Sequence, residues 1–524
     1  MHSIVSGEAG FGAPGRGAFT AAYLDFAALD GIIYPSNTFL PCGLAVRDYV
    51  LLYINGIEHR VRGADAFLPL TDYLRYNMSA CGTKVVCAEG DCGACTVAMG
   101  KLTAGGKLDY VPVNGCIQYV YQLDCSHVIT VEGVGNSEEL NPVQKAMVDC
   151  HGAQCGYCTP GFIVAMCSMF DSGEKIERAD IKEGLSGNLC RCTGYVSIID
   201  AALAVDAKKF VRFAEQYPDA AMCKAFKEHS QQPPLIEAEG RSVFCPFDLP
   251  SAVEFKKKHL DAVIVSGGTD VSVNMNKRGF EPENLLSTGN LPGMDQIEND
   301  GTSLTVGARV QLRQLEHYVK ELIPELYKVL FVFGSPQIRY AGTLAGNIAN
   351  ASPIADTGPF LFVMDAMIEV ASTAGSRQIK INDLYQGYKK LAMKPEEIIT
   401  KIHIPLPRKD DLLKLYKVSR REHLDISSFT AAIRMRRDSD SIVAPVVSYG
   451  GVGPVVLRLP KTEEFLRGKP FTLETFKSAG AIARSEITPL SDVRGSSDFR
   501  YQLAENVLLK FYYETAAERQ LVCR

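Results

Sequence analysis

The alternation of apolar and polar residues predicts a small sheet in the first quarter of the chain. Residues 50–54 and 58–62 alternate as strands do, and Asn55-Gly56 between them is typical of a tight hairpin turn. Residues 70–76 have the spacing of a helix. Further strand patterns follow at residues 96–99, 110–113 and 128–131. A hairpin, a helix and more strands predict a compact β-grasp unit over residues 49–135.

After this unit the apolar residues recur with the spacing of helices. Pro142 and Pro160 suit the first turns of two helices, and two more helices are predicted near residue 181 and over 194–203. These four helices indicate a small bundle over residues 136–217. The next stretch, 218–240, is polar and weakly periodic, as a linker is.

From residue 242 onward strands and helices alternate, and two glycine loops follow apolar strands. The first is Ser266-Gly-Gly-Thr-Asp270, and the second extends over residues 342–356. Glycine has no side chain to block the backbone, so amides in such loops can approach a pyrophosphate. Neither loop has the G-x-G-x-x-G spacing of a nicotinamide-binding Rossmann domain. Two such loops favour a bound redox cofactor over two plain turns.

Composition narrows the class of protein. A chain of 524 residues, 46% hydrophobic and 22% charged, is ordinary globular material and long enough for three or four domains. A net charge near -5 gives no basic surface for nucleic acid, and no apolar run is long enough to span a bilayer. We recognise no secretory signal and expect a reducing, cytoplasmic location without membrane attachment. Residues 1–48 form an N-terminal extension to which we assign no role.

Eight of the sixteen cysteines fall into two sets with ligand-like spacing. The sets are Cys87, Cys92, Cys95 and Cys116, then Cys155, Cys158, Cys190 and Cys192. The first spacing, C-x4-C-x2-C with a distant fourth cysteine, is that of plant-type ferredoxins, which hold a 2Fe-2S cluster. The second spacing differs and indicates a second cluster site, although structural zinc remains an alternative there. Disulfides are disfavoured because cysteine is sparse for a disulfide scaffold and the expected compartment is reducing.

Four runs of sequence resemble the xanthine dehydrogenase branch of the molybdenum hydroxylases. They are residues 82–97, 151–161, 187–195 and 342–356, and the resemblance extends over about residues 49–520. It implies an α+β multidomain fold. The implied parts are a plant-type 2Fe-2S ferredoxin domain of β-grasp fold at 49–135, a helical-bundle 2Fe-2S domain at 136–217, a linker at 218–240, an FAD-binding domain of vanillyl-alcohol-oxidase type at 241–408, and an α+β C-terminal subdomain at 409–524.

The resemblance also implies roles for individual residues. One 2Fe-2S cluster would be held by each cysteine set, and Gln154 would face a molybdopterin on another domain. The positions that match FAD-binding residues of the family are Ser266, Gly267, Gly268, Thr269, Asp270, Phe333, Thr343, Gly346, Asn347, Ser352, Asp356, Ile399 and Lys417. Tyr388 matches a position beside the nicotinamide path.

The chain ends at Arg524, where single-chain members of the family continue into a molybdopterin domain. We therefore expect a large molybdopterin-binding partner subunit, in a heterotetramer of two small and two large subunits, and no residue of this chain acting directly in substrate hydroxylation. The implied function is electron transfer from molybdenum through two 2Fe-2S clusters to FAD and then NAD, most simply in a xanthine or hypoxanthine dehydrogenase. The alternatives are an aldehyde or N-heterocycle oxidoreductase with another acceptor, such as oxygen or quinone, and a degenerate assembly factor.

Overall fold

The computed structural model describes residues 38–39, 45–135, 139–173 and 175–522. Most of the predicted N-terminal extension, together with Cys42 and Cys523, lies outside these residues. The described end of the extension is packed onto the first sheet unit, because buried Arg47 forms a 2.6 Å ion pair with buried Asp124. Strands β1 (Thr38–Phe39) and β2 (Ala45–Val46) pair with each other.

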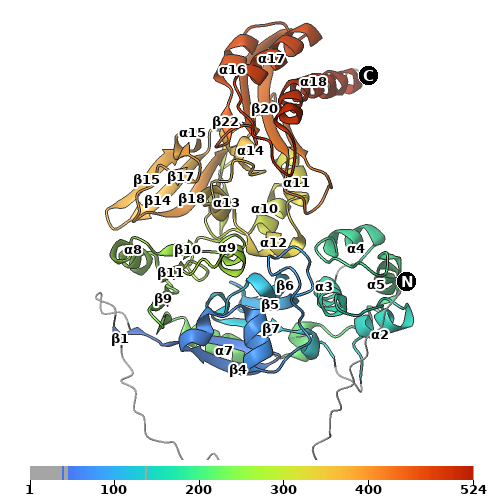
Figure 1. Cartoon of the computed structure of the whole chain (residues 1–524), viewed down its shortest axis with the longest axis vertical. Helices are drawn as coiled ribbons and strands as arrows, with labels where there is room; N and C mark the ends of the chain where they lie inside the picture. Colours follow the sequence, from blue (N-terminus) through green and yellow to red (C-terminus); the bar gives the residue numbers. More distant parts are fainter. Residues whose placement is uncertain (1–37, 40–44, 136–138, 174, 523–524) are drawn as a thin grey trace, which may run out of the picture.

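A five-stranded sheet in the order β4-β3-β7-β5-β6 forms the first unit, at the bottom of Figure 1. Its strands are β3 (Tyr49–Ile54), β4 (Ile57–Arg62), β5 (Thr96–Leu102), β6 (Leu108–Asn114) and β7 (Ser126–Ile129). The hairpin turns at Asn55-Gly56, both with positive φ, as that dipeptide predicts. The predicted helix forms as α1 (Leu70–Asp72) and a π turn, η2 (Tyr73–Asn77). Short 3-10 turns are η1 (Gly63–Phe67), η3 (Gly115–Ile117), η4 (Val120–Leu123) and η5 (Val131–Gly133).

Helices follow the sheet in sequence and lie beside it in Figure 1. They are α2 (Pro142–Asp149), α3 (Thr159–Asp171), α4 (Arg178–Gly184), α5 (Val196–Ala204) and α6 (Phe213–Gln216). Both prolines occupy first turns, as predicted. Helix α3 is apolar on nearly every side and forms the centre of this core, with Phe162, Val164 and Met166 almost fully buried.

The stretch expected to be a linker has regular structure. It contains α7 (Ala220–His229), which packs on β3, and β8 (Leu235–Ala238). The polar composition hid an amphipathic pattern: Met222, Cys223 and Phe226 are spaced on one face of α7 and are buried. Residues 218–240 therefore connect two parts of the chain through a packed helix.

Two sheets form the next part of the chain. The first has the order β10-β11-β9-β8, with β9 (Arg241–Phe244), β10 (Val263–Val265) and β11 (Asn284–Ser287) parallel to one another. The second is antiparallel, with β12 (Ile297–Asn299), β13 (Ser303–Gly307), β18 (Ile398–Pro405), β14 (Met367–Ser372) and β15 (Gly375–Lys380). The helices are α8 (Leu249–Lys258), α9 (Val271–Arg278), α10 (Leu312–Val319), α11 (Pro324–Phe331), α12 (Pro336–Ala341), α13 (Leu344–Ala349), α14 (Gly358–Val363) and α15 (Ile381–Leu384). A small hairpin joins β16 (Tyr385–Gly387) and β17 (Lys390–Leu391).

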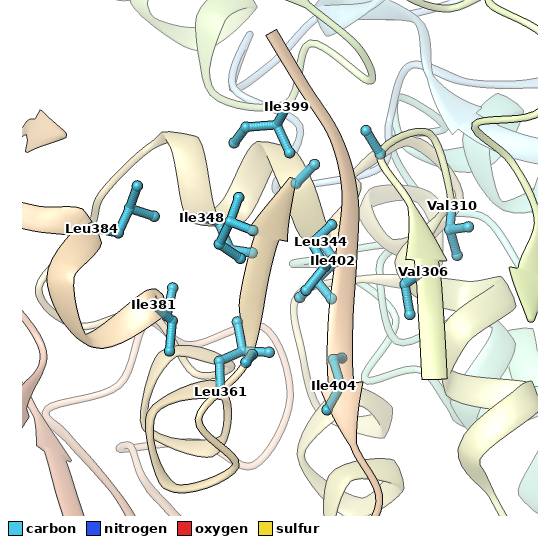
Figure 2. Close-up of a cluster of buried hydrophobic side chains, with 14 of the residues drawn as sticks. Val306, Val310, Leu344, Ile348, Leu361, Ile381, Leu384, Ile399, Ile402 and Ile404 are labelled. Atoms are coloured by element: carbon cyan, nitrogen blue, oxygen red, sulfur yellow. The ribbon is translucent and has the colours of Figure 1, made fainter. Parts of the chain in front are cut away.

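The core of this part lies between the antiparallel sheet and its helices. Figure 2 shows Ile402 and Ile404 of β18 against Leu344 and Ile348 of α13. Alternate residues of β18 point to one face, so Ile402 and Ile404 lie on the same side of the strand. This packing fixes α13, the helix that begins in the second glycine loop.

The C-terminal part, at the top of Figure 1, is a four-stranded antiparallel sheet covered by helices. Its elements are β19 (Leu412–Val418), β20 (Phe429–Asp438), β21 (Ser441–Gly450), β22 (Leu457–Arg458), α16 (Pro460–Leu466), α17 (Leu473–Ser485) and α18 (Ser497–Val522). The mixed helix and sheet content agrees with the predicted α+β class. None of the helices built from described residues is both long enough and apolar enough to cross a bilayer.

Candidate functional site

The first cysteine set lies in the loop between η2 and β5 and in η3. The Cys87 side chain contacts those of Cys92 and Cys116, and Cys116 also contacts Cys95. Cys95 and Cys116 are buried, whereas Cys87 and Cys92 are half-buried. Hydrogen bonds from the neighbouring thiols lower the pKa of Cys87, and the same contact with Cys87 raises the pKa of Cys92.

Two glycines shape this loop. Gly90 and Gly93 have φ of 77° and 66°, in the left-handed region that glycine adopts without strain. Asn114 Nδ2 donates to the Gly90 carbonyl at 2.8 Å and holds the loop against β6. The backbone N–H of Glu89 points at Cys87 Sγ, 3.5 Å away, as expected for a loop that stabilises anionic sulfur.

The second set lies at the junctions of loops with α3 and α5. Cys155 Sγ and Cys192 Sγ are 3.6 Å apart, and the Cys158 side chain contacts that of Cys190. Burial and the contact with Cys190 raise the pKa of Cys158 to about 12. Although burial opposes it, hydrogen bonds from Thr193 lower the pKa of Cys190. Cys155 and Cys192 are exposed, and the predicted Gln154 beside them is exposed too.

The four thiols of each set lie close to one another. Within residues 45–135, 139–173 and 175–522, no three or more His, Cys, Asp or Glu side chains converge on a position for one metal ion. The thiols of each set nevertheless contact one another: the contacts join Cys92 to Cys87, Cys87 to Cys116 and Cys116 to Cys95 in the first set, and Cys155 to Cys192 and Cys158 to Cys190 in the second. A 2Fe-2S cluster takes two cysteines on each of its two irons, so this donor set fits such a cluster.

The two glycine loops meet at the ends of β10 and α12. A Cβ on Gly267 would lie 1.7 Å from the Ala341 carbonyl oxygen, so only glycine fits there. Thr269 approaches Gly342 at the start of the second loop, and Thr343 Oγ1 accepts from Gly346 N at 3.0 Å to cap α13. The hydroxyl of Ser272, in the first turn of α9, is fully buried without a hydrogen-bond partner. Close backbone approach and an unused hydroxyl fit a phosphate-bearing cofactor.

The remaining predicted flavin residues surround the second loop. Asp356 accepts from Lys417 Nζ and from Ser427 Oγ, both at 2.6 Å, and the Lys417–Asp356 pair is nearly buried. Lys417 Nζ also reaches the Val332 carbonyl, next to the half-buried Phe333. Asn347 Oδ1 accepts from Thr357 Oγ1 at 2.6 Å, and Ser352 Oγ accepts from Ile354 N at 3.4 Å.

Other predicted positions lie apart from this group. Ile399 belongs to the buried core shown in Figure 2, at its upper edge. Tyr388 is 67% exposed, and Gln154 belongs to the helical part of the chain.

A cavity of about 570 Å³ lies between the first cysteine loop and the C-terminal part. Its lining includes Glu89, Asp91, Val273, Arg421 and Asp425. Glu89 and Asp91 belong to the cysteine run at 82–97, whereas Val273, Arg421 and Asp425 come from distant parts of the chain and are brought to it only by the fold.

Comparison with known proteins identifies three family domains in the chain. A model of the 2Fe-2S binding domain matches residues 130–203, one of the FAD binding domain in molybdopterin dehydrogenase matches 237–407, and one of the CO dehydrogenase flavoprotein C-terminal domain matches 414–515.

Individual relatives differ in what they oxidise. The chain is 28% identical over 532 residues to a xanthine dehydrogenase of Emericella nidulans, an alignment that covers 90% of this chain and 39% of the relative. It is 27% identical over 526 residues to aldehyde oxidase 1 of Bos taurus, an alignment that covers 89% of this chain and 39% of the relative. The structure of a reconstituted CO dehydrogenase from Oligotropha carboxidovorans aligns with 26% identity and a TM-score of 0.48, covering 51% of this chain and 94% of that one. The chain thus spans about 39% of the length of these curated relatives.

Proposed function

We propose that this chain, which carries the iron-sulfur and FAD domains of the molybdenum hydroxylase family, is the electron-transfer part of such an oxidoreductase. The observation that supports the proposal is the grouping of eight thiols into two sets of four, each with contacts among its side chains, within a chain that also has the family's flavin loops.

The protein's own part is to hold and tune the carriers. Cys87, Cys92, Cys95 and Cys116 would hold one 2Fe-2S cluster, and Cys155, Cys158, Cys190 and Cys192 the other. When bound, the clusters and FAD supply the redox chemistry between molybdenum and the final acceptor. Burial and hydrogen bonds to sulfur are the means by which the chain sets their potentials. Cys95 and Cys116 are buried, whereas Cys155 and Cys192 are exposed, so the two clusters would have different environments.

The flavin would lie across the two glycine loops. The backbone of residues 266–270 and the α13 cap at Thr343 would hold its phosphates. Lys417 would supply a nearly buried cation beside it, and a cation there favours a reduced, anionic flavin. Its pairing with Asp356 keeps that charge in place.

The substrate and the acceptor are finer proposals. We propose xanthine or hypoxanthine as substrate and NAD as acceptor. A large molybdopterin-binding subunit would supply the substrate site, in an assembly of two small and two large subunits. The similarity to an aldehyde oxidase supports the second candidate, an aldehyde or N-heterocycle oxidoreductase with another acceptor.

The test is the metal and flavin content of the tagged chain purified from its native host with its co-purifying polypeptides. We expect about four irons with acid-labile sulfide, one FAD, and molybdenum in a second, larger polypeptide. Zinc in place of iron, or a chain without flavin, would contradict the proposal and favour a structural or assembly role. NADH formation with hypoxanthine, measured against an aldehyde with oxygen, separates the two candidate reactions.

A matched pair of variants tests the ligand assignment. Cys155→Ser should lose one of two 2Fe-2S signals in electron paramagnetic resonance spectra. Cys81→Ser, at an equally exposed cysteine outside both sets, should keep both signals. Equal spectra for the two variants would show that Cys155 is not a ligand.

A further inference from the structure

The two cysteine loops are joined by a direct backbone hydrogen bond. The N–H of Leu189 donates to the carbonyl of Cys92 at 3.0 Å. Leu189 precedes Cys190 of the second set, and Cys92 belongs to the first. A single hydrogen bond therefore completes a short bonded path from one set of thiols to the other.

The backbones approach so closely here that a side chain would not fit. A Cβ on Gly93 would lie 2.3 Å from the Gly187 carbonyl oxygen. Gly93 therefore has to be glycine both for its positive φ and for this contact.

A buried amide side chain secures the contact. Asn188 is 2% exposed, and its Nδ2 donates to the Gly93 carbonyl at 2.9 Å and approaches Thr96 Oγ1 at 3.3 Å. Its Oδ1 accepts from Gln337 Nε2 at 2.8 Å. Gln337 is 1% exposed and belongs to α12, a helix of the flavin-binding part of the chain. Helix α12 packs against β6 of the first sheet unit (Figure 1). Three parts of the chain therefore meet at Asn188.

The placement of these bonds distinguishes them from an ordinary contact between domains. Asn188 bonds to the residue that follows Cys92, and it lies two residues before Cys190. Any loosening of Asn188 would change the position of one cysteine loop relative to the other. Both partners are buried, so their hydrogen-bonding groups have no water to replace a lost partner, which makes the arrangement rigid.

We propose that Asn188 and Gln337 are positioning residues that fix the separation and orientation of the two cysteine loops for electron transfer between them. This inference rests on the proposed function, in which each loop holds a 2Fe-2S cluster. The step itself moves one electron: one cluster is oxidised as the other is reduced, and no bond or proton changes place. The side-chain hydrogen bonds of Asn188 within the described residues go to Gly93, Thr96 and Gln337, so Asn188 would act through the backbone that it holds.

The test uses the full chain in its native complex with Asn188→Ala, Gln337→Ala and the control Gln502→Ala. Gln502 is an exposed amide on α18 whose side chain bonds to Asn506 on the same helix and, within the described residues, to no cysteine loop, so its removal should change nothing. The readouts are iron content, the magnetic interaction between the two reduced clusters in electron paramagnetic resonance, and the rate at which the second cluster is reduced in rapid-freeze experiments. We expect both variants to keep their iron, to show a weakened magnetic interaction, and to transfer electrons roughly tenfold more slowly, because small misplacements cost large factors in rate.

The outcomes separate this inference from the proposed function. Wild-type protein without two clusters contradicts the proposed function itself. Two interacting clusters in wild type, with the interaction and the rate unchanged in Asn188→Ala, overturn only the positioning role. If Asn188→Ala loses iron, Gln337→Ala decides, because the Gln337 side chain bonds to Asn188 and to Thr96 Oγ1 and leaves the Asn188–Gly93 bond in place when it is removed: an unchanged interaction there overturns the inference.

Discussion

The buried charges around Arg339 give the sharpest prediction for stability. Arg339 is 0% exposed and forms ion pairs with Glu316 of α10, 2.8 Å away and also buried, and with Glu183 of α4. Arg313 contacts the same two carboxylates, each at 2.8 Å. Although burial opposes it, these carboxylates raise the pKa of Arg313. The cluster joins the helical part of the chain to the flavin-binding part.

Replacing Arg339 with Met keeps most of the side-chain volume and removes the charge. Removing one partner of a buried ion pair costs about 3–5 kcal/mol, because the other charge stays buried without compensation. Glu316 would still be paired with Arg313, so we expect a loss of stability at the lower end of this range, about 3 kcal/mol. If the flavin-binding part, roughly 170 residues, unfolds as one unit, this loss of stability corresponds to a fall of about 6–12 °C in its Tm.

Differential scanning calorimetry is the suitable assay. The chain has no tryptophan, so protein fluorescence is a poor probe, whereas release of flavin gives a separate optical signal. Arg484→Met is the control, because Arg484 pairs with Glu505 at the surface with 45% of its side chain exposed. It should cost less than about 1 kcal/mol. A fall in Tm below about 2 °C for Arg339→Met would refute the reasoning. So would a double variant with Glu316→Leu that is no more stable than the single one, since an apolar replacement of the whole pair is about neutral.

Three further predictions concern the flavin loop, pH and the flavin potential. Gly267→Ala should yield protein with iron but little FAD, measured by absorbance, because its Cβ would lie 1.7 Å from the Ala341 carbonyl oxygen. Burial lowers the pKa of His127 to about 4, and Nε2 accepts from Gly56 N, so the native state keeps this ring neutral. The unfolded chain gains its proton near pH 6.5, so the stability from neutral His127 is complete above that pH and is lost as the pH falls towards 4, by about 2 kcal/mol at pH 5 in urea unfolding. Lys417→Met should make the flavin midpoint potential more negative in redox titration, because the cation favours the reduced anion.

Each of these has its own control. Gly105→Ala, at a turn with ordinary φ and free space, should keep FAD, and equal flavin loss in both would point to general destabilisation. His127→Gln should flatten the pH dependence between pH 7 and 5, and an unchanged slope would assign it to another group. Lys417→Arg keeps the charge and should keep the flavin midpoint potential. An unchanged potential in Lys417→Met would show that Lys417 does not act on the flavin.

Local patterns predicted the elements of the fold where local chemistry decides them. The Asn55-Gly56 turn and the prolines that begin α2 and α3 follow from dihedral preference alone. The cysteines were found because ligands to a cluster have a fixed spacing. Helix α7 was missed because its three buried residues are few among charged neighbours.

The contacts between parts of the chain could not be predicted in the same way. Asn188 lies in a run that the family resemblance had already marked, yet nothing in that run shows that its side chain bonds to a residue near Cys92 and to one on α12. Arg339 reads in the sequence as a charged residue on a short helix, which is normally exposed. Only the fold shows that burial makes its partners obligatory.

Helix α12 takes part in both junctions. Gln337 and Arg339 are two residues apart, so they point to different sides of the helix, one towards the cysteine loops and one towards Glu316 and Glu183. A shift of α12 after loss of Arg339 would therefore move Gln337 as well, and a changed cluster interaction in Arg339→Met would not by itself identify the cause. Asn188→Ala leaves the ion pairs intact, so it isolates the positioning of the cysteine loops from the stability of the junction.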